Sequence, residues 1–172
     1  MRIYLVGYMG SGKTTVGRRL ANALEWQFID MDHYIEKQQN KSILEIFNEE
    51  GEDTFRKLEQ QAIKDSFSWQ KTIISTGGGT PCFNNNMDLL INNGLCFYLY
   101  MPAKALADRL KQSKKQRPLL EHISPMELDD FIKTNLQKRE AFYFRSHFTI
   151  DVLNPYSIQI LMNRIKEHYN II

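Results

Sequence analysis

The sequence predicts an α/β fold in which a parallel sheet of about five strands carries helices on both faces. Short apolar runs alternate with stretches of helical periodicity along the chain. A glycine-rich segment also separates the first apolar run, residues 3–6, from the first helical stretch. With 172 residues, of which 42% are hydrophobic and 24% charged, the chain is expected to form one domain over residues 1–172.

The glycine-rich segment, residues 7–14, reads GYMGSGKT and matches the G-x-x-x-x-G-K-[ST] pattern of a phosphate-binding P-loop. Backbone N–H groups of such a loop and the positive end of the next helix bind phosphate oxygens. Lys13 is expected to bring its charge to the β- and γ-phosphates, and Thr14 to coordinate Mg²⁺. The predicted phosphate-binding residues are Gly10, Ser11, Gly12, Lys13, Thr14 and Thr15.

The second predicted strand, residues 27–29, ends at two carboxylates, Asp30 and Asp32. Ligands bind at the carboxyl ends of strands in open α/β sheets, so both side chains are expected beside the P-loop. The alternative is that one of them simply caps the next helix.

Two helices are predicted next. Ser42 and Glu45 form a capping-box pattern that opens the first, and Gly51 is expected to end it. The second runs through residues 55–63, where Arg56 and Glu59 are spaced to pair on one face. Taken alone, such a spacing is more often that of a surface ion pair than of a binding element.

A strand at residues 72–75 is followed directly by the triple glycine of residues 77–79. Consecutive glycines fit a backbone that approaches a ligand closely or adopts positive φ, and a flexible turn is the alternative. The pattern then predicts a short helix at residues 86–93, a strand at 96–100 and a helix from 103 to about 111.

Residues 112–120 are polar and basic without periodicity, which predicts a loop. Most such loops are solvated surface, but in a P-loop protein a basic loop can close over the phosphates and supply an arginine. A capping box at Ser124 and Glu127 then starts a helix whose apolar stripe continues onto Arg139. A guanidinium on that stripe needs an anion from the protein or from a ligand.

The remaining pattern predicts a strand through residues 148–152 and a last helix that starts at Asn154 and Pro155. A formal charge of +2 and the lack of a long basic run speak against nucleic acid as a partner. No apolar run approaches the roughly 20 residues that span a bilayer, so no membrane association is expected. Cys82 and Cys96 are expected to be free thiols, and the cytoplasm is the expected compartment.

Together these motifs resemble those of the shikimate kinase family along nearly the whole chain. The motifs that carry the resemblance are GYMGSGKTT at residues 7–15, Asp30 with Asp32, FRKLE at residues 55–59, STGGG at residues 75–79, RPLL at residues 117–120, and Arg139 followed by Tyr143. P-loops occur in many enzymes, but this combination in this order is specific. The resemblance implies the three-layer P-loop kinase-like fold and transfer of the γ-phosphoryl group of ATP to the 3-hydroxyl of shikimate. The products would be 3-phosphoshikimate and ADP, in chorismate and aromatic amino-acid biosynthesis.

The resemblance also implies roles for single residues. Asp32 would contact the substrate hydroxyls and act as the base, and Lys13 and Arg117 would complete the catalytic set. Arg56 and Arg139 would hold the substrate carboxylate, with Gly78 as a backbone contact.

At the nucleotide, Arg117 would reach the ATP phosphates, and Arg109 and Pro155 would lie near the adenine. Asp30 and Ser75 would approach the Mg²⁺ through water. Helices in residues 32–66 would bind the substrate, residues 112–123 would form a lid, and the protein would be a monomer.

Three other functions remain open at this point. A gluconate-type kinase and a nucleoside-monophosphate kinase share the P-loop and a basic lid, but the F-R-x-x-E motif with the triple glycine argues against both. A non-catalytic nucleotide-dependent regulator could also use this fold, because a fold alone fixes no activity. It would not need Asp32, Arg56 and Arg139 together.

Overall fold

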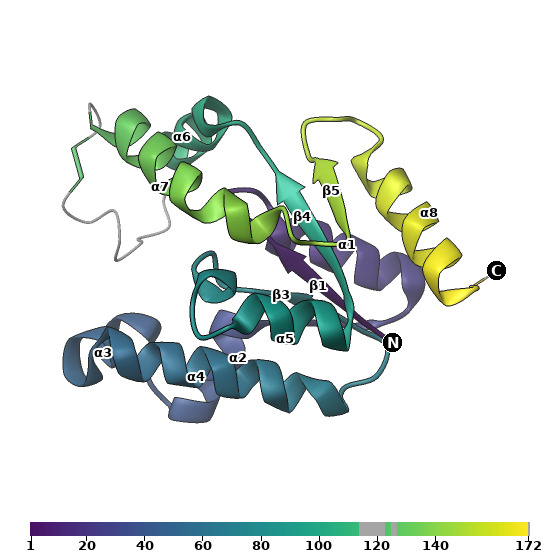
Figure 1. The fold of residues 1–172 in the computed structure, drawn as a ribbon, viewed down its shortest axis with the longest axis horizontal. Coiled ribbons are helices and arrows are strands. Elements are labelled where there is room, and N and C mark those ends of the chain that lie inside the picture. Colours follow the sequence, from purple (N-terminus) through teal and green to yellow (C-terminus); the bar gives the residue numbers. More distant parts are fainter. Residues whose placement is uncertain (114–122, 125–126, 172) are drawn as a thin grey trace.

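The computed structural model describes residues 1–113, 123–124 and 127–171. Its centre is a five-stranded sheet with the strand order β2-β3-β1-β4-β5 (Figure 1). The strands are β1 (Arg2–Val6), β2 (Gln27–Asp30), β3 (Thr72–Ser75), β4 (Leu95–Tyr100) and β5 (Phe148–Asp151). Every pairing is parallel, so the predicted parallel sheet is confirmed.

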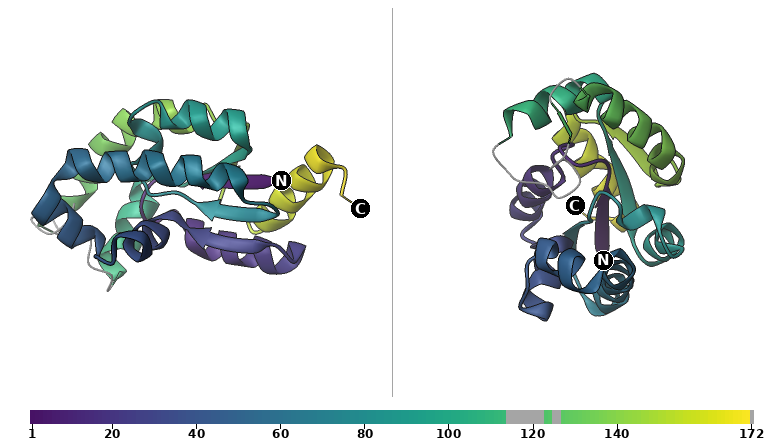
Figure 2. Two further views of the ribbon diagram at one scale, coloured as in Figure 1. Left: turned by 90° about the horizontal axis from the view of Figure 1, so that it is seen from below. Right: turned by 90° about the vertical axis from the view of Figure 1, so that its left-hand side faces the viewer.

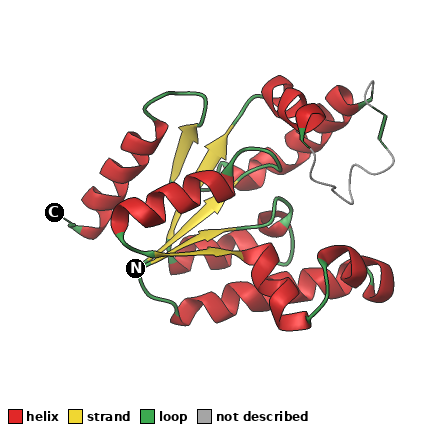
Figure 3. Ribbon diagram, turned by 180° about the vertical axis from the view of Figure 1, so that it is seen from behind, coloured by secondary structure: helices red, strands yellow, loops and turns green. Residues whose placement is uncertain are grey.

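Helices connect the strands and cover both faces of the sheet. The α-helices are α1 (Lys13–Leu24), α2 (Met31–Gln39), α3 (Ile43–Glu50), α4 (Glu52–Asp65), α5 (Asn86–Asn93), α6 (Ala103–Gln112), α7 (Leu128–Tyr143) and α8 (Ser157–Tyr169), with short 3₁₀ turns η1 (Ser66–Ser68) and η2 (Thr80–Cys82). Figure 2 shows α1 on one side of the sheet and α5 and α7 on the other, and Figure 3 shows the layers from behind. The three-layer α/β fold is confirmed.

The three central strands of the sheet, β1, β3 and β4, are buried on both faces, whereas the edge strands β2 and β5 are partly exposed. Side chains alternate along a strand, so Ile3 and Leu5 of β1 join the core formed with α1 and α8. Tyr4 and Val6 face the opposite core, which α2, α4, α5 and α7 complete. Burial on both faces explains why the strands read as continuous apolar runs instead of alternating ones.

Both predicted capping boxes are present. The Ser42 hydroxyl accepts a hydrogen bond from the Glu45 N–H at 3.2 Å, and the Glu45 carboxylate accepts from the Ser42 N–H at 2.7 Å. These bonds satisfy N–H groups that the first turn of α3 leaves without partners. Ser124 and Glu127 exchange the same two bonds, each at 3.3 Å, but α7 begins only at Leu128, so the predicted helix start at Ser124 is wrong.

The predicted start of the last helix is wrong. Helix α8 begins at Ser157, after a turn in which the Asn154 side chain accepts a hydrogen bond from the Tyr156 N–H at 2.9 Å. This local bond competes with helix formation and delays the first helical residue. Among the described residues, no helix has both the length and the apolarity needed to cross a membrane.

His147 lies directly before β5 and forms a hydrogen bond with β4. Strand β4 pairs with β5 from Phe97 and Phe148 onward, and the His147 Nδ1 accepts a hydrogen bond from the Cys96 N–H at 3.1 Å. The ring also lies 6.5 Å from that of His168 on α8. Partial burial, and then the neighbouring His168, lower the pKa of His147. A protonated Nδ1 could not accept this bond, so the folded protein favours neutral His147.

We expect the free energy of unfolding to fall as the pH drops below about 6.5, the ordinary histidine pKa. Below that value the unfolded chain takes up a proton that folded His147 resists, so stability is lost as the pH decreases. His147→Asn should weaken this dependence, because an amide oxygen can accept from the Cys96 N–H and does not titrate. Urea unfolding of parent and variant between about pH 7.5 and 5 measures the effect, with His33→Asn on the exposed face of α2 as control. An unchanged pH dependence in His147→Asn would contradict it.

Candidate active site

The P-loop joins β1 to the first turn of α1, as predicted. Gly10 and Gly12 have φ angles of 85° and 92°, which residues with a Cβ rarely adopt. Lys13 is buried, and its Nζ donates hydrogen bonds to the carbonyl oxygens of Gly7 at 2.8 Å and Tyr8 at 3.0 Å. The ammonium group is thus held across the loop, next to the backbone N–H groups that would face phosphate oxygens.

The hydroxyl groups of the loop fit a phosphate with a bound Mg²⁺. Ser11 Oγ is buried and has no hydrogen-bond partner among the described residues, which is rare for a buried hydroxyl. Thr14 Oγ1 donates to Asp30 Oδ2 at 2.8 Å, and Asp30 is paired in register with Ser75 on β3. Hydroxyl and carboxylate oxygens are the ligands that Mg²⁺ prefers, directly or through water.

The two predicted carboxylates differ in position. Asp30 precedes α2 but makes no capping hydrogen bond with its side chain, which binds Thr14 instead. Asp32 lies in the first turn of α2 and is half-buried. The capping alternative is therefore wrong for the Asp30 side chain.

Arg56 and Glu59 on α4 form a buried ion pair. Arg56 Nη1 donates to Glu59 Oε2 at 2.6 Å, and the side chains are only 9% and 1% exposed, so the surface interpretation of this pair is wrong. The second Glu59 oxygen accepts a hydrogen bond from the Thr80 hydroxyl. Arg56 Nε and Nη2 donate to Glu52 Oε1 at 3.1 and 2.7 Å, and the guanidinium lies 3.9 Å from the Phe83 ring. These contacts fix the plane of the guanidinium.

The pair also fixes the charge at this position. Burial raises the pKa of Glu59, against the opposing effects of Arg56 and the Thr80 hydroxyl. Burial alone would lower the pKa of Arg56, but Glu59 and then Glu52 outweigh it, so the pKa of Arg56 is raised. Arg56 therefore remains a cation although its side chain is only 9% exposed.

The triple glycine, residues 77–79, brings the predicted substrate groups together. A Cβ on the first glycine would lie 2.7 Å from Asp32 Oδ1, one on the second 3.2 Å from Met9 N, and one on the third 2.9 Å from Arg56 Nη1. None of the three has a positive φ. Close approach, and not an unusual backbone conformation, explains why glycine occupies all three positions. The segment places Asp32, Arg56 and the P-loop next to one another.

Arg139 on α7 is half-buried, and its guanidinium lies 5.4 Å from the centre of the Tyr8 ring of the P-loop. Its Nη1 is buried and has no hydrogen-bond partner in the part of the chain that the structure describes. The positive charge of Arg139 interacts with the buried Glu59 carboxylate and acts to lower the pKa of Glu59. A buried cationic N–H without an acceptor is costly, so the expected need for an anion remains.

The other predicted site residues are more dispersed. Arg109 Nη1 donates to the Gly10 carbonyl oxygen at 3.4 Å, at the edge of the P-loop. Thr15 and Pro155 are exposed, and Pro155 lies in the turn before α8. Arg117 and most of the predicted lid lie outside the described residues.

Sequence reasoning missed two residues that hold this site together. Glu52 lies four residues before Arg56, a spacing at which helix side chains pair, so a signal was present. Thr80 gave no signal, because its hydrogen bond to Glu59 joins two segments 21 residues apart.

Comparison with known proteins identifies the family of this chain. The family model described as shikimate kinase matches residues 9–168. A shikimate kinase from Azobacteroides pseudotrichonymphae is 46% identical over 143 residues, which cover 83% of this chain and 84% of that protein. The crystal structure of shikimate kinase from Bacteroides thetaiotaomicron has a TM-score of 0.88 at 38% identity, covering 99% of this chain and 98% of that one.

A further structure, shikimate kinase from Acinetobacter baumannii in complex with shikimate, has a TM-score of 0.86 at 33% identity. The alignment covers 98% of this chain and 93% of that one. These matches decide against the gluconate-type and nucleoside-monophosphate kinases. They span both the P-loop and the buried arginine site, and the chain belongs to the shikimate kinase family.

Proposed function

We propose that the protein is a shikimate kinase, which transfers the γ-phosphoryl group of ATP to the 3-hydroxyl of shikimate and releases 3-phosphoshikimate and ADP. The product would enter the pathway to chorismate and the aromatic amino acids. One observation carries the proposal: Asp32, the buried cation Arg56 and the P-loop each lie directly beside one of the three consecutive glycines. The shikimate complex of the relative from Acinetobacter baumannii supports it.

The nucleotide would bind at residues 10–15. The unpartnered Ser11 hydroxyl and the loop N–H groups would meet phosphate oxygens, and Lys13 would exchange its carbonyl partners for the β- and γ-phosphates. Thr14 would coordinate Mg²⁺ directly, and Asp30 and Ser75 would interact with the ion through water molecules. Bound Mg²⁺ neutralises the charge of the β- and γ-phosphates during transfer. Arg117 from the lid, and Arg109 and Pro155 near the adenine, complete the proposed nucleotide contacts.

The shikimate carboxylate would bind between Arg56 and Arg139. Within the described residues, Glu59 and Glu52 accept three of the five N–H groups of Arg56, which leaves one on each terminal nitrogen. Arg139 offers its buried, unpartnered Nη1. Two planar guanidinium groups suit a carboxylate, because each offers parallel donors at a fixed spacing. Gly78 would add a backbone contact.

Asp32 would act as the general base. Its carboxylate, beside the triple glycine, would accept the proton of the 3-hydroxyl as that oxygen bonds to the γ-phosphorus. The bond from the γ-phosphorus to the β,γ-bridging oxygen breaks, and ADP leaves with that electron pair. Since phosphoryl transfer depends on positioning and charge neutralisation, Lys13 and Arg117 would supply the rest of the stabilisation.

We further propose that residues 1–172 work as a single kinase domain and as a monomer in the cytoplasm. Helices within residues 32–66 would bind the substrate, and residues 112–123 would form the lid. The formal charge of +2 supports a function without nucleic acid.

A coupled assay for ADP, with and without shikimate, tests the proposed function. We expect ADP release to depend on shikimate, and Asp32→Asn to lower kcat by about 10²–10⁴-fold, the usual contribution of a general base. Circular dichroism should show the variant folded. ATP turnover that ignores shikimate would instead support a nucleotide-dependent regulator, and a change confined to KM would make Asp32 only a substrate anchor.

Arg139→Ala should raise the KM for shikimate on the order of 10²-fold and leave the KM for ATP near that of the parent, because the carboxylate would lose a buried partner. Lys138→Ala, an exposed neighbour on the same helix, is the matched control and should change neither value. A shikimate analogue without the carboxylate should bind parent and Arg139→Ala about equally in calorimetry. If the analogue still distinguishes them, Arg139 has a partner within the protein and does not bind the carboxylate.

A further inference from the structure

The hydroxyl of Tyr143 ties the end of α7 to the triple glycine. The side chain is fully buried, and its hydroxyl donates a hydrogen bond to the Gly78 carbonyl oxygen at 2.5 Å. Burial raises the pKa of Tyr143, so the hydroxyl keeps its proton and can donate at neutral pH. The bond joins residues 65 positions apart in the sequence, so it fixes one segment against another.

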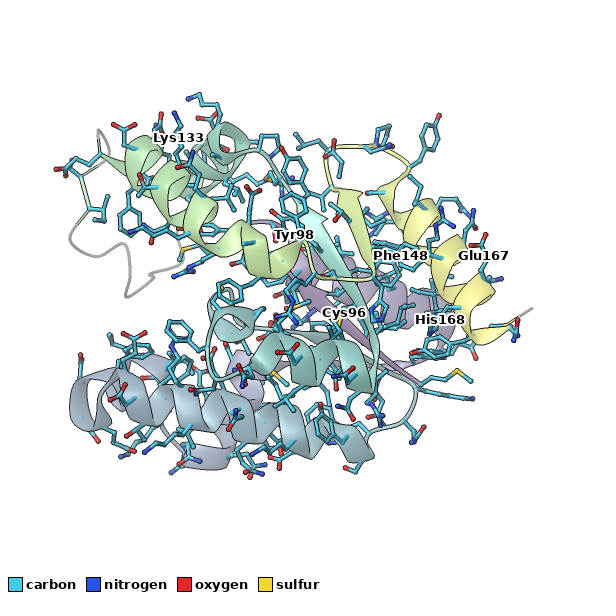
Figure 4. The ribbon with its side chains drawn as sticks, in the orientation of Figure 1. Cys96, Tyr98, Lys133, Phe148, Glu167 and His168 are labelled. Atoms are coloured by element: carbon cyan, nitrogen blue, oxygen red, sulfur yellow. The ribbon has the colours of Figure 1, made fainter. Side chains whose placement is uncertain are left out.

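Packing holds the Tyr143 ring in place. Its centre lies 5.1 Å from that of Tyr98, at an interplanar angle of 39°. Figure 4 labels Tyr98 on β4, beside the C-terminal half of α7. The Tyr98 hydroxyl in turn donates to Glu140 Oε1 at 3.0 Å. Because the Tyr143 ring packs against Tyr98 of β4 in the core, its hydroxyl has a fixed position.

The carbonyl that Tyr143 binds belongs to the peptide between Gly78 and Gly79. Peptide bonds are trans throughout the described residues, so the Gly79 N–H points away from the Tyr143 hydroxyl. The two glycines lie against the P-loop at Met9 N and against Arg56 Nη1. No hydrogen bond from the N–H of either glycine is found within the described part of the chain. The Gly79 N–H of this peptide and the Gly78 N–H of the preceding one are therefore free donors between the phosphate site and the buried arginine.

Tyr143 also neighbours the second arginine. Arg139 lies four residues earlier on α7, so both side chains share one face of the helix. The charge of Arg139 acts on the Tyr143 hydroxyl, in the direction that lowers its pKa. The hydroxyl thus lies between two groups that are proposed to bind shikimate, Gly78 and Arg139.

We propose that Tyr143 is a positioning residue of the substrate site, whose hydroxyl holds the Gly78–Gly79 peptide and the Arg139 side chain in the orientation that binds shikimate. The inference rests on the proposed function. A purely structural hydroxyl, present only to satisfy a buried carbonyl, would affect stability without acting on one substrate selectively.

Tyr143→Phe tests this, since it keeps the ring and removes only the hydroxyl. We expect the KM for shikimate to rise about tenfold, which corresponds to roughly 1.4 kcal/mol, while kcat and the KM for ATP stay within about twofold. Tyr98→Phe is the matched control: it removes a buried tyrosine hydroxyl from the touching ring, but one bonded to Glu140. It should lower the melting temperature and leave the KM for shikimate unchanged.

An unchanged KM for shikimate in Tyr143→Phe, or an equal rise of that KM in Tyr98→Phe, would overturn the inference. The proposed function would still stand if the parent phosphorylates shikimate. A parent without shikimate turnover would overturn both. If Tyr143→Phe does not fold, an experiment on the unsubstituted protein tests the inference. We expect shikimate to slow amide hydrogen exchange at Gly78 or Gly79, measured by NMR. If shikimate changes the exchange rate of neither amide, the backbone held by Tyr143 does not contact the substrate.

Discussion

The buried ion pair between Arg56 and Glu59 is the interaction on which the proposed substrate site depends. Glu59 is nearly inaccessible, and its two oxygens are occupied by Arg56 and Thr80. Removing one partner of such a pair typically costs about 3–5 kcal/mol, because the other charge is left buried and uncompensated. The pair also constrains the local sequence, since a Cβ at residue 77 would lie 3.0 Å from Glu59 Oε1 and one at residue 79 would lie 2.9 Å from Arg56 Nη1. A substantial part of the local stability is therefore coupled to the position of one cation.

The two ends of the site are built differently. The phosphate end comes from one continuous segment, in which β1, the P-loop and α1 follow one another. The proposed substrate end combines side chains from α2, α4 and α7 with the loop after β3, which the strand order β2-β3-β1 brings next to the P-loop (Figure 1). The carboxyl ends of adjacent parallel strands meet at one edge, where the local P-loop lies beside the proposed substrate site, which is assembled from distant segments.

The same difference explains how much could be predicted from the sequence. Strand and helix periodicity, the P-loop and both capping boxes are local patterns, and the structure contains them. The start of α8 was misplaced because Asn-Pro can open a helix or a turn, and the Asn154 side chain stabilises the turn. Burial of the Arg56–Glu59 pair could not be predicted, since spacing on a helix does not reveal what covers that face. Thr80 depends on tertiary contact in the same way.

We propose that the Arg56 guanidinium, held as a planar fork by Glu59, binds the shikimate carboxylate. Calorimetric titration of shikimate into the parent and into Arg56→Lys, without nucleotide, tests it most directly, because lysine keeps the charge opposite Glu59 but lacks the fork. We expect Arg56→Lys to be folded by circular dichroism and to bind shikimate about tenfold or more weakly than the parent. A folded Arg56→Lys that binds shikimate within about twofold of the parent would contradict it.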